Sequence, residues 1–186
     1  MQFTLPILAC FASISLAVPI ATPNELATRD AIIIDRAISR AHVALNNLVK
    51  SIDGYYFAPS RHAVSQQRLI SDDSQVAVDA LTQGAQQISA GPPVDRLEKA
   101  GVVLRAKDLL DLLRKTSDSW VRAKSVIVSS GGRQTIGQAV KKQANAANTF
   151  AAALVHKMPG GEAEGLATWY ELEVNQAVYK SVVAFN

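Results

Sequence analysis

The feature that most constrains this chain is a repeated spacing of inward-facing residues by four and three positions, which is the signature of one face of an α-helix. Glycine and proline separate five such runs, and no credible alternation with the period of two expected of a strand lies between them. The predicted inward positions are Ile34, Ile38, Ala41, Leu45, Leu48 and Ile52; Ile70, Ser74, Ala77, Leu81, Gly84 and Ile88; Val102, Ala106, Leu109, Leu113, Thr116, Trp120, Ala123 and Ile127; Ile136, Val140, Gln143, Ala147, Phe150 or Ala151, and Leu154; and Leu166, Tyr170, Val174, Ala177 or Val178, Ser181 and Phe185.

Helix-breaking residues set the expected ends of these segments. We expect the first helix to start at the capping box of residues 22–25, or at residues 28–30, and to stop at Asp53-Gly54. Later breaks are expected at 91–93, 131–132 and 159–161. Because short connections join long amphipathic helices, antiparallel neighbours are favoured. The fold class is therefore all-α: an up-and-down bundle of about five amphipathic helices.

The first residues have the character of an export signal. No charged side chain occurs before Glu25, and residues 5–18 are almost wholly apolar, which is too short a run for a membrane span. Small residues at 15–17 predict cleavage after Ala17, although the usual basic residue near the start is missing. The expected organisation is a signal peptide at 1–17 and a single helical-bundle domain at 18–186. The product is expected to be secreted and extracellular, with cell-wall association left open.

Cysteine usage and charge narrow the functions further. The only cysteine, Cys10, lies in the predicted leader, so the mature chain would have no disulfide, no thiol nucleophile and no cysteine-ligated metal. The net charge of +3 comes from scattered lysines and arginines, which suits a solvated surface better than nucleic-acid binding. No apolar run after the leader is long enough to span a membrane.

The sequence carries no motif that would support catalysis or metal binding. Nucleophile elbows, phosphate-binding glycine loops and paired-histidine zinc motifs are all absent. His42, His62 and His156 fall on three different predicted elements without a second ligand at suitable spacing. We therefore expect a non-enzymatic protein with no metal and no cofactor.

An aromatic run, Tyr55-Tyr56-Phe57, is the least ordinary local feature. It is expected in a loop between Gly54 and Pro59, where polar residues are more usual. Two interpretations remain open. The rings either cap the end of the bundle core, or they form an exposed apolar patch or the mouth of a ligand pocket.

The sizes of the inward residues also leave two alternatives. The second and fourth runs are rich in alanine, glycine, serine and glutamine, so these helices either approach closely or leave space between them. An empty apolar void of some 300 Å3 would cost roughly 7 kcal/mol at about 24 cal/mol per Å3, so it must collapse or be filled. A fatty acyl chain could fill it, gaining about 0.8 kcal/mol for each buried methylene.

Several segments together resemble the fungal hydrophobic surface binding protein A family, which includes cell-wall galactomannoproteins. They are Arg29-Asp30-Ala31 with Ile34, Ala37-Ile38 and Leu45-x-x-Leu48-Val49; Ser71-Asp72-Asp73 with Leu81; and Lys99, Lys107, Lys124 and the segment Phe150 to Pro159. The similarity spans about residues 29–186. It implies an exported, helical, non-catalytic protein that carries fatty acids between its helices, or that adsorbs to hydrophobic surfaces and recruits a secreted hydrolase.

The first hypothesis is accordingly a secreted protein that binds a fatty acid or similar apolar molecule between its helices. Its positional candidates for the lining are Ile38, Leu45, Leu81, Leu109, Leu113, Phe150 and Leu154, with the aromatic run near an opening. The second hypothesis is a solid bundle whose aromatic run adsorbs to a hydrophobic surface and docks a secreted hydrolase. A third, an effector that acts on a host protein, leaves no mark in the sequence.

Overall fold

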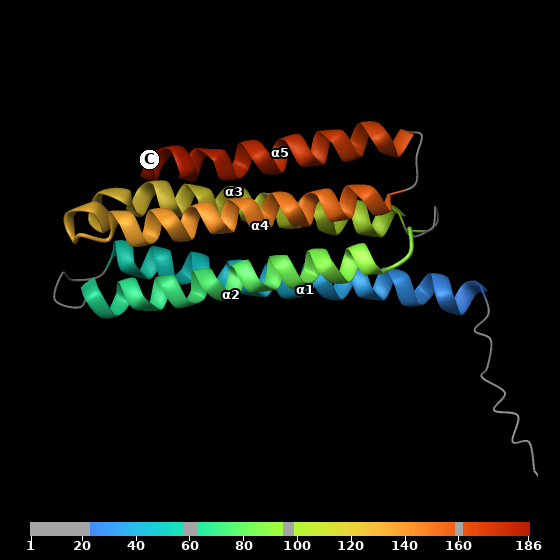
Figure 1. The fold of residues 1–186 in the computed structure, drawn as a ribbon, viewed down its shortest axis with the longest axis horizontal. Helices are drawn as coiled ribbons and strands as arrows, with labels where there is room; N and C mark the ends of the chain where they lie inside the picture. The colour runs from blue at the N-terminus through green and yellow to red at the C-terminus, as the bar shows by residue number, and fades with distance from the viewer. Residues whose placement is uncertain (1–22, 58–62, 95–98, 159–161) are drawn as a thin grey trace, which may run out of the picture.

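The protein is a bundle of long helices. The computed structural model describes residues 23–57, 63–94, 99–158 and 162–186, and within these ranges it contains five helices and no strand. Figure 1 shows the helices lying side by side along one axis. Their bounds are α1 Pro23–Tyr56, α2 Ala63–Ala90, α3 Lys99–Ser129, α4 Arg133–Lys157 and α5 Glu162–Phe185. The expected all-α bundle is confirmed. The predicted leader and the capping threonine lie outside the described residues.

The helices pack as a closed ring in an order that differs from their order in the chain. Helix α1 contacts α2, α2 contacts α4, α4 contacts α5, α5 contacts α3, and α3 returns to α1. Across the ring, α3 and α4 touch only sparsely. In Figure 1, α1 and α2 form one layer, α3 and α4 the next, and α5 an outer layer. The chain reverses direction at each connection, yet α1 with α3, α2 with α4, and α3 with α5 are parallel neighbours.

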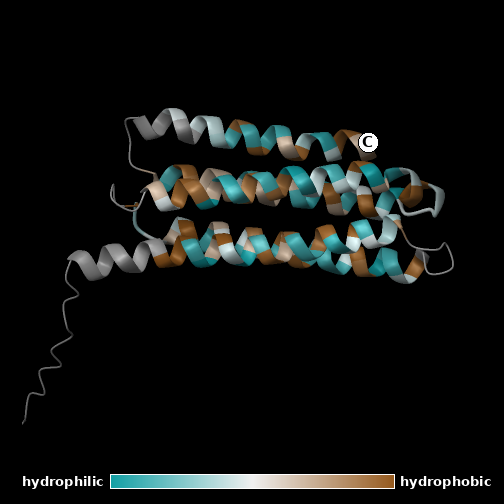
Figure 2. Cartoon of the chain, turned by 180° about the vertical axis from the view of Figure 1, so that it is seen from behind, coloured by the Kyte–Doolittle hydropathy of each residue, from teal (hydrophilic) through white to brown (hydrophobic). Residues whose placement is uncertain are grey.

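The predicted core faces are confirmed. Every inward position of the first four runs is buried, including both alternatives, Phe150 and Ala151. In α5 the predicted positions from Tyr170 to Phe185 are also buried, except that Ala177 is half-buried, while the side chain of Leu166 lies outside the described set. Hydrophobic and hydrophilic segments alternate along the helices in Figure 2, as expected when each helix buries one stripe.

One predicted helix end is wrong. Helix α1 does not stop at Asp53-Gly54 but continues to Tyr56. Glycine inside a helix costs about 1 kcal/mol relative to alanine. Continuing the helix buries Tyr55, which is 2% exposed, and burial of a large side chain contributes roughly 1.5 to 3 kcal/mol. Packing of the next residue therefore outweighs the local preference of Gly54 for a break.

Glycines end α3 as predicted. Gly131 has a φ of +80°, a conformation that residues with a side chain rarely adopt. The N–H of Gly132 then donates to the carbonyl of Ile127 at 2.9 Å, which satisfies one of the free carbonyls at the helix end. This turn leads directly into α4.

At the opposite end of the bundle, the segment after α2 is tied to α4. The N–H of Val94 donates to the carbonyl of Lys157 at 2.8 Å, and the Lys157 ammonium donates to the carbonyl of Gly91. Val94 itself is buried. The described residues after α2 therefore lie against the last turn of α4.

Ion pairs on the outside link α3 to both of its neighbours. Because their side chains are a quarter to three-fifths exposed, each contributes at most about 1 kcal/mol. The hydrogen bond from Arg114 to Glu173 also raises the pKa of the Arg114 guanidinium. The pairs are Arg105–Asp35 and Arg122–Asp53 toward α1, and Arg114–Glu173 and Lys180–Asp118 toward α5. These ion pairs therefore set the orientation of α3 relative to α1 and α5 more than they add to the free energy of unfolding.

Candidate ligand-binding site

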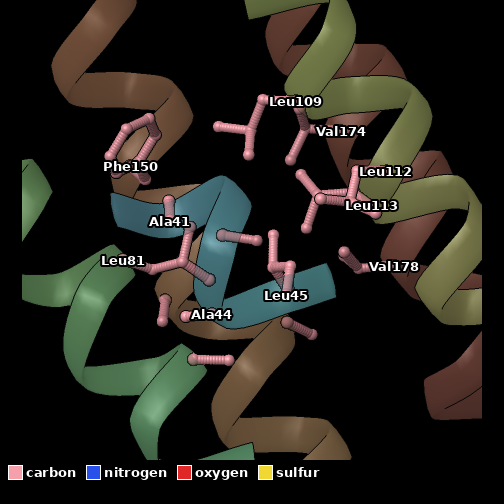
Figure 3. Packing of buried hydrophobic residues seen from close by; sticks show 14 of the residues in the cluster. Ala41, Ala44, Leu45, Leu81, Leu109, Leu112, Leu113, Phe150, Val174 and Val178 are labelled. Carbon is pink, nitrogen blue, oxygen red and sulfur yellow. The ribbon is translucent and has the colours of Figure 1, made fainter. Parts of the chain in front are cut away.

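The interior of the ring contains all seven residues predicted to line a ligand site. Each is at most 4% exposed, and all belong to one hydrophobic cluster. Figure 3 shows Leu45, Leu81, Leu109, Leu113 and Phe150 in this cluster, coming from four different helices. Helix α5 completes the surround with Val174 and Val178. The structure thus brings the predicted residues together, and their role as a ligand lining stays a prediction. They are Ile38, Leu45, Leu81, Leu109, Leu113, Phe150 and Leu154.

A polar bridge crosses this apolar interior. The indole N–H of Trp120 on α3 donates to the Oε1 of Gln143 on α4 at 2.9 Å, and the two residues are 1% and 4% exposed. Since α3 and α4 otherwise touch only sparsely, this bond joins two helices that face each other across the ring. The Trp120 ring also meets the ring of Phe185 edge to face, with centroids 6.1 Å apart.

Small residues in α2 serve close packing at one level of the interior. A Cβ placed on Gly84 would lie 2.6 Å from the Cε2 of Phe150 and 3.4 Å from the Cβ of Ala37. The missing side chain therefore makes room for the Phe150 ring between α1, α2 and α4. Of the two alternatives for the small residues, close approach holds at Gly84.

Two serines in the interior have hydroxyl groups that lack a hydrogen-bond partner. The hydroxyl oxygens of Ser74 on α2 and Ser117 on α3 are buried and have no hydrogen-bond partner. A buried polar group without a partner costs about 1 to 3 kcal/mol, so such groups are rare in folded proteins. Both hydroxyls retain the capacity to bond a polar group brought in by a ligand.

The aromatic run is split between core and surface. Tyr55 lies in the last turn of α1, and its hydroxyl is 2.5 Å from the Ser130 Oγ and accepts from Gln67 Nε2 at 3.0 Å. Tyr56 and Phe57 are 41% and 80% exposed, and their rings meet edge to face. The expected loop is wrong for Tyr55 and Tyr56. The capping interpretation fits Tyr55, and the patch interpretation fits Phe57.

Helix α5 carries a second apolar face that the sequence analysis did not identify. Four of its large apolar residues are substantially exposed: Trp169 (43%), Leu172 (55%), Tyr179 (63%) and Val183 (51%). Their spacing of three, seven and four is itself helical, and it runs along the side of α5 opposite Tyr170, Val174 and Val178. A search for two apolar stripes on one helix would have found it. We call these four residues the outer stripe of α5.

Two open grooves on the outside contain none of the seven predicted lining residues. One, of about 660 Å3, lies beside the start of α4 and includes Arg133, Lys141 and Phe185. The other, of about 510 Å3, lies between α1 and α2 and includes Arg40 and Asp79. Neither groove gathers catalytic groups.

Other site types find little support in the described part of the chain. No group of three metal-capable side chains occurs there, and His42 and His156 are exposed, while His62 lies outside it. None of the described helices combines the length and apolarity needed to cross a lipid bilayer. Burial raises the pKa of the Tyr170 phenol, which keeps that group neutral.

Fold and interior together define a helical bundle whose distinctive chemistry, over the described residues, is an apolar centre rather than a set of reactive groups. The chain belongs to the hydrophobic surface binding protein A family, whose model matches residues 33–156. This confirms the family resemblance found in the sequence. No curated protein sequence matches the chain.

Solved structures share the fold at low sequence identity. Ligand binding domain 1 of the Penicillium marneffei MP1 protein, complexed with arachidonic acids, has a TM-score of 0.76 at 22% identity, covering 85% of this chain and 99% of that one. Domain 2 of the same protein, complexed with multiple arachidonic acids, has a TM-score of 0.72 at 19% sequence identity. The match covers 83% of this chain and 94% of that domain. AFMP4P in complex with palmitic acid has a TM-score of 0.74 at 13% sequence identity. The match covers 84% of this chain and 99% of that one.

Proposed function

We propose that this protein is a non-catalytic carrier that binds a fatty acid or a similar apolar chain between its helices. The observation that carries the proposal is the ring itself: α3 and α4 face each other with little direct contact, and aliphatic side chains from all five helices occupy the region between them. Proteins of the same fold have been solved with arachidonic and palmitic acids.

The energetics favour a long aliphatic ligand. Burying about 15 methylenes gains roughly 12 kcal/mol at about 0.8 kcal/mol each. Association and ordering cost about 4 to 15 kcal/mol, so a chain of this length is near the minimum for useful affinity. The side chains around the interior, such as Leu109 and Leu113, offer no charge or metal, so recognition would depend on shape and desolvation.

The unpaired hydroxyls of Ser74 and Ser117 support a place for the ligand's polar end. Both are buried on helices that face the interior. The acid group of a bound fatty acid could accept hydrogen bonds from these hydroxyls. It would then have hydrogen-bond partners even though it is buried away from water. We expect Ser117→Ala to weaken binding of a fatty acid more than binding of its uncharged methyl ester.

The proposal includes export. Residues 1–17 would act as a signal peptide, and residues 18–186 would form one domain that works outside the cell. Amino-terminal sequencing of the protein collected from the culture medium of its host tests this directly. A chain that begins at Val18 is the expected result, and a chain that keeps its apolar start would contradict it.

Lipid analysis of the native protein tests the carrier function. Protein purified from its host without detergent should release fatty acid on denaturation, measured by mass spectrometry, and the delipidated protein should take up a fluorescent fatty acid. If neither lipid release nor uptake is detected in repeated preparations, the carrier function is wrong.

A matched pair of variants on α3 locates the ligand. Leu113→Trp enlarges a side chain that is 2% exposed in the interior, whereas Leu104→Trp makes the same change at a position that is 62% exposed. The interior variant should lose most fatty-acid uptake, and the surface variant should keep it. Circular dichroism confirms folding, because overpacking of a core costs about 1 to 3 kcal/mol. Equal uptake by both variants would place the ligand elsewhere.

A second candidate function is adsorption to a hydrophobic surface, with recruitment of a secreted hydrolase. The exposed rings of Tyr56 and Phe57, with Val64 81% exposed at the start of α2, support it. Replacing Tyr56 and Phe57 with serine should reduce adsorption to alkyl-coated beads without loss of structure. Tyr55→Ser is unsuitable as part of this test because its hydroxyl and ring stabilise the bundle end. Unchanged adsorption would contradict this candidate.

A further inference from the structure

At one end of the bundle, side-chain hydrogen bonds join the end of α1, the start of α2 and the end of α3. The Nε2 of Gln67 donates to the Tyr55 hydroxyl at 3.0 Å and to the Ser130 Oγ at 2.7 Å. The Tyr55 hydroxyl and the Ser130 Oγ are themselves 2.5 Å apart. In Figure 1 this is the left end, where the chain passes from α1 to α2 and from α3 to α4. These bonds hold the three helix ends together.

Each of the three helices has an exposed apolar side chain at this end and an exposed cation further back. The two are four residues apart in α2 and α3 and seven apart in α1, so each pair lies on one face of its helix. The pairs are Val64 with Arg68 in α2, Val128 with Lys124 in α3, and Phe57, directly after α1, with Lys50. We call these six residues the tip.

The cations of the tip are available to a partner. Among the described residues, none of the three has an ion pair or a side-chain hydrogen bond. The carboxylates nearby are different: Asp53 is bonded to Arg122, and Asp73 accepts a hydrogen bond from Ser51. Asp72 is exposed but lies more than two turns in from the start of α2. The tip therefore presents three unpaired positive charges.

The order of apolar side chain and cation matches the layers of an anionic bilayer. Four residues of a helix span about 6 Å and seven span about 10 Å. Amphipathic surfaces enter a bilayer by about 5 to 10 Å and keep their cations among the headgroups. Phe57, Val64 and Val128 can therefore reach the acyl chains while the cations behind them meet lipid phosphates. A solid hydrocarbon surface would desolvate these cations without pairing them, which is unfavourable.

We propose that this protein docks end-on to anionic lipid bilayers through the tip. This goes beyond fatty-acid binding in the interior, because none of the six tip residues belongs to the hydrophobic cluster there. Each cation at an anionic membrane surface strengthens binding about fivefold, so the three together contribute roughly 100-fold. This contribution is electrostatic and should decrease as the salt concentration rises.

Flotation of the full chain with lipid vesicles tests the docking. The wild type should float with phosphatidylcholine vesicles that contain about one-quarter phosphatidylglycerol, and far less with phosphatidylcholine alone. Arg68→Gln with Lys124→Gln should weaken binding to the anionic vesicles roughly 30-fold. Arg36→Gln with Lys107→Gln removes the same charge at exposed positions about 30 Å from the tip and should bind like the wild type. Absence of binding, or an equal loss in both double variants, would overturn the proposal.

The apolar part of the tip requires its own comparison. Phe57→Ser with Val64→Ser should weaken binding to anionic vesicles at least about tenfold, because less apolar surface is buried. Val43→Ser with Val76→Ser changes two exposed residues in the middle of α1 and α2 and should have little effect. If the first double variant binds normally, the tip binds anions in general, as an acidic protein would offer them, and the proposal is wrong. Equal binding of the wild type to neutral and anionic vesicles would also refute it.

A fluorescent label distinguishes docking by the end from docking by the side. In a Cys10→Ser background the chain has no other cysteine, so an environment-sensitive dye can be attached at Phe57→Cys or at Val43→Cys. These positions are about 21 Å apart along the helix direction. Anionic vesicles should shift the emission of the dye to the blue at position 57 but not at position 43. Equal shifts would mean that the side of the bundle docks, which contradicts the proposal.

Fatty-acid uptake without vesicles separates this inference from the carrier function. Arg68→Gln with Lys124→Gln should take up fatty acid like the wild type, since the interior residues are unchanged. Loss of docking with normal uptake by the wild type refutes only the docking. Loss of uptake with normal docking refutes only the carrier.

Discussion

Removal of the amide that bonds Trp120 should destabilise the bundle from its centre. In Gln143→Leu the indole N–H of Trp120 keeps its buried position but loses its acceptor at 2.9 Å. A buried donor left without a partner costs about 1 to 3 kcal/mol. For a chain of this size, 1 kcal/mol lowers the melting temperature by about 2 to 4 °C, so a loss of about 2 kcal/mol corresponds to roughly 4 to 8 °C.

Urea unfolding followed by circular dichroism measures this cost, and two comparisons isolate its cause. Gln138→Leu makes the same substitution at an exposed position of α4 and should be close to neutral. In a Trp120→Phe background, Gln143→Leu should be nearly neutral or stabilising, because both partners of the bond are then apolar. An equal cost of Gln143→Leu in the two backgrounds would refute the reasoning, since the loss would not then depend on the indole N–H.

Three further outcomes are expected. Gly84→Ala should lower stability by about 1 to 3 kcal/mol in urea unfolding, because the new methyl group overlaps the Phe150 ring; a neutral effect would show that the ring moves freely. Gly131→Ala should cost about 1 to 2 kcal/mol by the same assay, because its φ of +80° strains any residue with a Cβ. Burial raises the pKa of Tyr170, so its contribution is complete below about pH 10, where the unfolded phenol ionises, and is lost as the pH rises above it. Tyr170→Phe should lose less stability than the wild type between about pH 9 and 11, and parallel pH profiles would contradict this.

Periodicity was sufficient to find the core because burial of one helical face is a local property of the sequence. The runs that end in Ile52, Ile88, Ile127 and Leu154 have every inward position buried. The prediction of helix ends fails where long-range packing competes with the local preference of a residue. At Gly54 the burial of Tyr55 carries the helix past a residue that usually ends one.

The order of the helices around the ring could not be predicted from connection lengths. Short connections suggested that consecutive helices would be neighbours, and this holds for α1 with α2 and for α4 with α5. Helix α3 instead lies against α1 and α5, and the segment at Val94 is bonded to the end of α4. No sequence period encodes long-range contacts of this kind, which here are one backbone bond and one lysine bond.

The burial of the candidate lining residues was predictable from the sequence, but their neighbours were not. The four-three pattern places Leu109 and Leu113 inside, yet it does not say which helix they face. The aromatic run was treated as a unit, and the structure divides it because consecutive residues on a helix point about 100° apart. The outer stripe of α5 lies outside the prediction, because one four-three pattern describes only one face of a helix.

Helix α5 is the last helix of the chain and closes the ring between α3 and α4. Helix α5 packs mainly on two others and comes last in the chain, whereas α1, α2 and α4 are joined through Gly84 and Phe150. Local opening of α5 would leave that junction of α1, α2 and α4 intact, but it would expose buried residues such as Val174 and Phe185. Hydrogen exchange should accordingly be fastest in α5. We expect a long molecule that enters or leaves the centre to pass where α5 separates from α3 and α4.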